Sequence, residues 1–234
     1  MGCDIHTMAE VLVPTDRGET DFEWLAMKVP VFPNPYYTPG LRVDGEKDQW
    51  GFNHPTTRAP YKGRNYNLFA VLADVRNYGD LEAIEDPRGV PDDASKAWRK
   101  YTEGDGDLHS HSWFTLAELR KAKAGQYFEQ RIEVTGALTR PAYTRLVEQE
   151  VEPGQWSQPG DLDITPAQFM AMDAAHQEAF TGHIIMTWTT TIDLTHAYKI
   201  ITDNLEMVAP RSSPRGELDA VLPERVRIVF AFDN

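Results

Sequence analysis

The stretch CDIHTMAEVLV at residues 3–13 opens the chain with apolar and β-branched side chains, a composition that predicts a β-strand. Pro14 ends this run, and residues 15–18 (TDRG) have the composition of a tight turn. Residues 22–31 have the same strand-like character as the opening stretch. The sequence therefore predicts a β-hairpin at the N-terminus.

The last residues of the chain also predict a strand. Apolar side chains alternate onto one face within residues 225–232, at Val226, Ile228, Phe230 and Phe232. Because both ends of the chain are predicted strands, we expect the two to pair near the middle of one sheet.

Between these ends, apolar periodicity predicts helices interspersed with two more strands. The helices are expected at residues 65–75, 94–101, 165–181 and 193–207, and a further helix at a capping box of Thr115 and Glu118. The strands are expected at residues 128–135 and 184–191. This order predicts an α/β fold of mixed α+β type. We expect one central mixed or antiparallel sheet that contains the N- and C-terminal strands and is flanked by helices.

The length of 234 residues fits one large domain, so we expect a single domain over residues 1–234. Residues 30–62 contain six prolines and several aromatic residues without periodicity, which predicts a long ordered loop. Residues 210–223 predict a linker.

Composition narrows the classes of function. The formal net charge of −13 disfavours binding of long nucleic acids, which draws on Lys and Arg contacts to phosphates, but allows a small anion in a locally basic pocket. No apolar run reaches the roughly 18 residues of a membrane span, and no secretion signal opens the chain. The chain has one cysteine, Cys3, so it cannot form an intrachain disulfide, and we expect a protein of the reducing cytoplasm. The position of Cys3 in the predicted strand predicts a buried core residue. Homo-oligomer formation stays open.

Two histidine-bearing segments are candidates for chemistry. Asp4 and His6 are two residues apart on the predicted first strand, so they share a face. His109 and His111 have the same spacing in a predicted loop before a helix. Carboxylate and imidazole groups at this spacing suit a divalent metal ion or an acid–base pair. The alternative is a solvent-facing strand pair for the first segment and a hydrogen-bonded turn for the second.

Polar residues elsewhere fit recognition of a phosphorylated ligand. In the stretch GRNYN (residues 63–67), Arg64 and Asn65 at a helix start fit a phosphate or carboxylate, and Tyr66 fits stacking on a base. Arg88, between a proline and a glycine, is a second cation candidate. Asp233 follows the last strand and joins the site if that strand lies beside the first. The alternative for Arg64 is an exposed side chain at a helix cap.

Several of these pieces together resemble a family of uncharacterised proteins found largely in phages and prophages. The matching stretches are MGCDIH at the start, GRNYNLFAVLADVRN at residues 63–77, PRGVPDD at 87–93, HSHSW at 109–113 and RIVFAFDN at the end. The resemblance implies a phage-type protein that acts inside an infected bacterium, and it supplies no activity.

We therefore predict that the two histidine segments converge on one site. His6, His109 and His111 are the expected catalytic residues, and Asp4, His6, His109, His111 and Asp233 are the expected ligands of a divalent metal ion. Arg64, Asn65, Tyr66 and Arg88 are expected to bind a small nucleotide-like ligand. The expected reaction is phosphodiester hydrolysis of a small nucleotide signal, in countering host defence. Sequestration of such a ligand, and protein–protein inhibition through residues 30–62, are the alternatives.

Overall fold

The computed structural model describes residues 2–16, 18–30, 57–154, 156–210 and 221–233. They group into two compact units: unit 1 contains Met1–Gln130 and Asp193–Asn234, and unit 2 contains Arg131–Ile192. The expectation of a single domain stays a prediction. Most of the expected loop at residues 30–62 and most of the expected linker at residues 210–223 lie outside the described residues.

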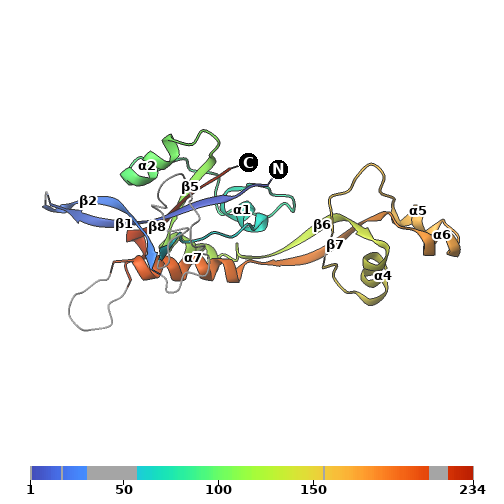
Figure 1. Ribbon diagram of the computed structural model, residues 1–234. Coiled ribbons are helices and arrows are strands. Elements are labelled where there is room, and N and C mark those ends of the chain that lie inside the picture. Colours follow the sequence, from blue (N-terminus) through green and yellow to red (C-terminus); the bar gives the residue numbers. More distant parts are fainter. Residues whose placement is uncertain (1, 17, 31–56, 155, 211–220, 234) are drawn as a thin grey trace. The chain divides into compact units, whose positions relative to one another are not determined.

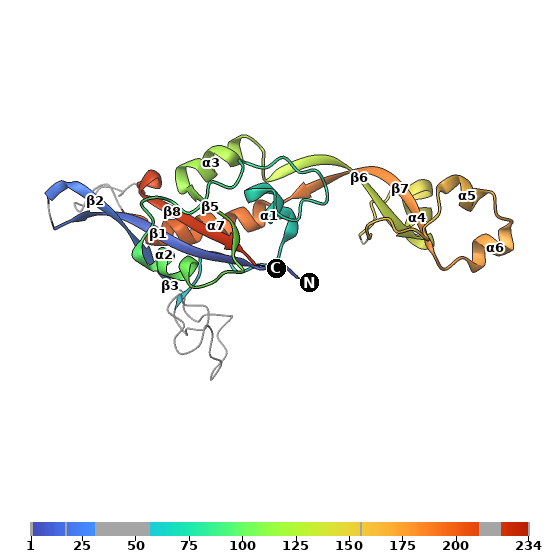
Figure 2. The ribbon, with the colours of Figure 1, turned by 90° about the horizontal axis from the view of Figure 1, so that it is seen from above.

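Unit 1 is built on an antiparallel sheet whose strands run in the order β2-β1-β8-β5 (Figure 1, Figure 2). The strands are β1 (Ile5–Thr15), β2 (Gly18–Met27), β5 (His109–Thr115) and β8 (Val226–Phe232). The first and last strands of the chain are neighbours, with Ile5 opposite Phe232 and Val11 opposite Val226. The predicted mixed α+β class, the N-terminal hairpin and the pairing of the terminal strands are therefore confirmed.

Both faces of this sheet are covered, which explains why every residue of β8 is buried. Figure 1 shows α2 (Lys96–Glu103) on one side of the sheet and α7 (Thr195–Val208) on the other. Opposed residues in an antiparallel pair share a face, and neighbours along a strand alternate. On the α2 face, Trp98 packs with Met8, Val229 and Ala231.

A buried ion pair lies on the same face as α2. The guanidinium Nε of Arg227 donates to Oε2 of Glu10 at 2.7 Å, and the two side chains are 2% and 0% exposed. Glu10 also accepts from the backbone N–H of Ser95, while Arg227 donates to Asp93. The ring of Trp24 covers the guanidinium at 3.9 Å. These contacts attach the segment that precedes α2 to the middle of the sheet.

Three helices of unit 1 begin at capping residues. In α1 (Tyr66–Ala73) the side chain of Asn65 accepts from the N–H of Leu68, and in α2 Ser95 accepts from Trp98. In α3 (Leu116–Ala124) the predicted capping box of Thr115 and Glu118 is present. Short elements complete unit 1: β3 (Val29–Pro30) pairs with β4 (Thr57–Arg58), and the 3-10 helix η1 (Pro223–Arg225) precedes β8.

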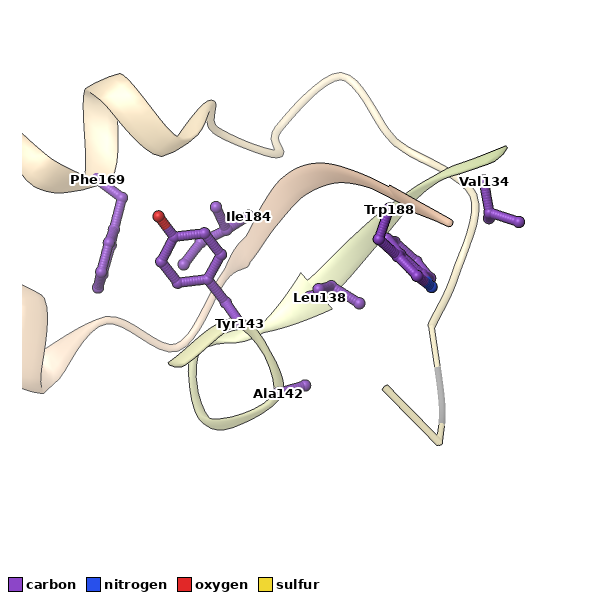
Figure 3. Packing of buried hydrophobic residues seen from close by; sticks show 7 residues of the cluster. All are labelled: Val134, Leu138, Ala142, Tyr143, Phe169, Ile184 and Trp188. Atoms are coloured by element: carbon purple, nitrogen blue, oxygen red, sulfur yellow. The ribbon is translucent and has the colours of Figure 1, made fainter. Parts of the chain in front are cut away.

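Unit 2 has its own apolar core on a two-stranded ribbon of β6 (Glu129–Thr139) and β7 (His183–Asp193). The other elements are α4 (Arg140–Gln149), α5 (Pro166–Met170) and α6 (Ala174–Ala179). Figure 3 shows seven buried residues that gather from the strands and helices: Val134, Leu138, Ala142, Tyr143, Phe169, Ile184 and Trp188. A separate core explains why residues 131–192 form a compact unit.

Two expectations for unit 2 need correction. The structure contains the helix α4, which the sequence did not predict. The expected helix at residues 165–181 consists of two short helices, because Asp173 caps a new helix by accepting from the N–H of His176. The start of the first is as predicted, with a capping box of Thr165 and Gln168.

Within the described ranges, no helix is both long enough and apolar enough to span a membrane.

Candidate functional site

The ends of β1 and β8 bring Asp4, His6 and Asp233 together. The backbone N–H of Asp4 donates to Oδ1 of Asp233 at 2.8 Å, and the N–H of Asp233 donates to the carbonyl of Asp4 at 3.2 Å. The ring Nε2 of His6 lies 3.1 Å from Oδ2 of the same carboxylate. Asp233 therefore contacts both predicted residues of the opening strand.

The other ring nitrogen of His6 contacts a residue that the sequence did not indicate. The hydroxyl of Tyr101, in the last turn of α2, lies 2.6 Å from Nδ1 of His6. A carboxylate can only accept, so Asp233 favours the ring form with hydrogen on Nε2. The lone pair on Nδ1 then accepts the hydroxyl hydrogen of Tyr101. We call Tyr101, His6 and Asp233 the relay, because the hydrogen bond to Asp233 favours the ring form of His6 that accepts from Tyr101.

Arg64 forms an exposed ion pair with Asp4 of this cluster. Its Nε and Nη2 donate to the two carboxylate oxygens of Asp4 at 2.7 and 2.6 Å. These hydrogen bonds hold the pKa of Asp4 below its usual value. Of the other predicted ligand-binding residues nearby, Asn65 caps α1, and the hydroxyl of Tyr66 accepts from the N–H of Cys3. Cys3 is buried, as its position in the sequence predicts.

His109 and His111 lie in β5, at a bulge rather than in the expected loop. Ser110 has a φ of 48°, and the pairing with β8 shifts between His109 and Ser112. Nδ1 of His109 lies 3.0 Å from the hydroxyl of Ser110. Nε2 of His109 and Nδ1 of His111 are buried and have no hydrogen-bond partner. Burial lowers the pKa of His111, so its neutral form is favoured.

The structure separates His6 from His109, although both lie at the same end of the sheet. His6 is opposite Ala231 and His109 is opposite Phe232, so the two side chains project from opposite faces. Their contacts agree: His6 meets Tyr101 of α2, whereas His109 packs on Phe232, with ring centroids 6.2 Å apart. His109 therefore does not converge with His6, because neighbouring positions of β8 direct their partners to different faces. The convergence of His111 with His6 stays a prediction.

Arg88 has partners outside the relay. Its guanidinium pairs with Glu85, donates to Glu118 at 2.9 Å and stacks over the rings of Trp113 and Phe114. These contacts attach residues 85–89 to β5 and to the start of α3. Its predicted role in ligand binding stays a prediction.

The predicted metal ligands divide accordingly. Asp4, His6 and Asp233 form one group, while His109 and His111 lie at the bulge in β5. In the part of the chain that the structure describes, no three His, Cys, Asp or Glu side chains are placed to hold one metal ion. The relay places His6 between a hydroxyl and a carboxylate, an arrangement that can transfer a proton.

No protein-family model matches the chain, and neither a curated protein nor a solved structure matches it.

Proposed function

We propose that this protein hydrolyses a phosphodiester bond in a small nucleotide or nucleotide-derived signal, with the relay as its acid–base centre. One observation carries the proposal: a hydroxyl, an imidazole and a carboxylate lie in a hydrogen-bonded row, at 2.6 and 3.1 Å. Rows of this kind activate a hydroxyl for attack in enzymes of unrelated folds. His6 and Asp233 are half-buried, which limits access of water without closing the site.

The chemistry follows from the direction of the hydrogen bonds. As the oxygen of Tyr101 bonds to phosphorus, its proton passes to Nδ1 of His6 and Asp233 stabilises the resulting imidazolium. The bond from phosphorus to the leaving oxygen breaks, and the imidazolium protonates that oxygen. Water then attacks phosphorus and gives its proton to His6, and the departing oxygen of Tyr101 takes the proton back. In sum, one phosphodiester and one water are converted to an alcohol and a phosphate monoester.

The ligand class rests on the charged groups near the relay. Arg64 is exposed and its present partner, Asp4, is exposed as well. An ion pair in solvent contributes little stability, so a phosphate oxygen competes with Asp4 for the guanidinium. The resemblance to phage and prophage proteins suggests the setting, an infected bacterial cell, and the role of countering host defence.

A panel of linear and cyclic nucleotides of one to three residues, with bis(p-nitrophenyl) phosphate as a general diester, tests the proposal. We expect the wild-type protein to convert at least one of these to a monoester, and His6→Gln to reduce the rate by about 10²–10⁴-fold. His196→Gln, which removes an exposed histidine of α7, is the matched control and keeps the full rate.

The outcomes separate the alternatives. Tight binding of a nucleotide that is recovered intact contradicts hydrolysis and supports sequestration. Loss of turnover on chelation, restored by a divalent ion, contradicts the metal-free relay and supports a metal-dependent site. Absence of both binding and turnover contradicts the proposal and favours protein–protein inhibition.

A further inference from the structure

A second polar site lies beside α7, on the face of the sheet opposite to the relay. A cavity of about 130 Å³ lies among residues 58–63, Ile200 and Asn204. The contacts of Thr7 show on which face of the sheet the cavity lies. Thr7 is opposite Phe230, on the face away from His6, and its hydroxyl donates to the carbonyl of Tyr61, which lines the cavity. One water molecule needs roughly 10–15 Å³ in such a cavity, so there is room for a tetrahedral oxyanion.

The guanidinium of Arg58 is held in a fixed orientation at this cavity. Its Nη2 donates to Oδ1 of Asn204 at 2.9 Å. Nδ2 of Asn204 in turn donates to the carbonyl of Pro60 at 2.6 Å. Asn204 is 1% exposed, and these two hydrogen bonds determine which end of its amide meets Arg58. The remaining N–H groups of Arg58 are therefore positioned before any ligand arrives.

Arg58 also lacks the carboxylate partner that four other arginines of this acidic chain have. Its Nε is buried and has no hydrogen-bond partner. Its contact with Asn204 is to a neutral amide, and no carboxylate pairs with it among the described residues. By contrast, carboxylates pair with Arg64, Arg88, Arg120 and Arg227. Buried charged donors in native proteins nearly always have a partner, which is often an ion or ordered water.

We propose that this cavity binds a phosphate-sized oxyanion, with the guanidinium of Arg58 as its main donor. Guanidinium N–H groups match the spacing of phosphate oxygens. Lys62 lines the same cavity and supplies a second positive charge. Ala59 and Pro60 line it as well, which limits competing water around the anion. The site is distinct from the relay and does not rest on the proposed hydrolysis.

Titration of the full chain with inorganic phosphate, by calorimetry at constant ionic strength with chloride as the replacing anion, tests this site. We expect saturable one-to-one binding. Arg58→Gln weakens it at least tenfold, and Lys62→Gln, at an exposed position that folding tolerates, weakens it several-fold. Arg120→Gln is the matched control, because it removes the same charge beside α7 from an arginine already paired with Glu206, and it leaves binding unchanged.

His6→Gln locates the binding site independently of the proposed function. Phosphate binding that survives His6→Gln but not Arg58→Gln supports the cavity, whether or not turnover is found. Non-saturating heats with the wild-type protein, or equal affinity in wild type, Arg58→Gln and Lys62→Gln, overturn the proposal. Loss of binding in His6→Gln alone also overturns it, since the phosphate then binds at the relay.

Discussion

The imidazole of His6 and the carboxylate of Asp233, 227 residues apart in the sequence, lie 3.1 Å from each other. The pairing of β1 with β8 produces this contact, since His6 is opposite Ala231 and Asp233 lies two positions further along on the same face. The contact sets the ring form of His6 that accepts from Tyr101.

Replacing the carboxylate of Asp233 by an amide is therefore expected to move the ring hydrogen of His6 from Nε2 to Nδ1. In Asp233→Asn, the amide N–H₂ donates to Nε2 of His6, so hydrogen moves to Nδ1 and the ring no longer accepts from Tyr101. We expect kcat to fall by about 10²–10⁴-fold with KM changed little. Steady-state kinetics on the diester identified by the nucleotide panel measure both. An unchanged kcat would show that the carboxylate has no part in turnover.

Stability is expected to depend on pH through His111. Burial lowers the pKa of this ring, an effect that a hydrogen bond with the backbone of Leu108 opposes and that the charge of His109 reinforces. Because the folded state takes up the proton less readily than the unfolded chain, this contribution to stability is full above the unfolded pKa of about 6.5 and is lost as pH falls through the lower folded pKa.

The check is urea unfolding at several pH values between 8 and 5. His111→Gln is expected to lose less stability than the wild type as pH falls through this range, and the exposed His196→Gln to follow the wild type. Parallel curves for wild type and His111→Gln would contradict the assignment.

Removing one partner of the buried ion pair of Glu10 and Arg227 is expected to destabilise the protein more than replacing both partners by apolar residues. Arg227→Met leaves the buried carboxylate of Glu10 without its charged partner, and Glu10→Met leaves the buried Arg227 with Asp93 as its carboxylate partner. Each single variant is expected to lower the free energy of unfolding by about 3–5 kcal/mol. The double variant Glu10→Met with Arg227→Met removes both charges, so we expect it to be more stable than either single variant. Denaturant unfolding tests this order, and strictly additive losses would contradict it.

The core of unit 2 is expected to respond separately from the sheet of unit 1. Leu138 is 0% exposed in the cluster of Figure 3, so Leu138→Ala is expected to cost about 2–5 kcal/mol in unit 2. Val147→Ala, at a side chain 51% exposed in the neighbouring helix α4, is the control and is expected to cost less than about 0.5 kcal/mol.

Hydrogen exchange reports the two units side by side. We expect Leu138→Ala to accelerate exchange in β6 and β7 within unit 2 and to leave the amides of β8 protected. Equal acceleration in both units would show that the chain unfolds as one cooperative body.

The parts of the fold that local patterns determine could be predicted. The alternation in residues 225–232 identified β8, and the Thr115–Glu118 and Thr165–Gln168 patterns identified two helix starts that the structure contains. The strand β5 was missed because the bulge at Ser110 interrupts the alternation on which a strand prediction depends.

The candidate site was predicted only in part, because its decisive contacts are long-range. The sequence suggested that His6 and Asp233 meet, but not that His6 and His109 face opposite sides, which depends on strand register. Tyr101 was missed: it ends a predicted helix, and nothing in the local sequence relates it to a residue 95 positions away.

The most direct test of the account is the rate of diester hydrolysis by Tyr101→Phe, a change that removes one oxygen and keeps the ring on α2. Tyr198→Phe, which removes a hydroxyl from the half-buried tyrosine of α7, is the matched control. The relay predicts that Tyr101→Phe loses at least about a hundredfold in kcat while Tyr198→Phe keeps the wild-type rate. Full activity in Tyr101→Phe would contradict the relay as the centre of the chemistry.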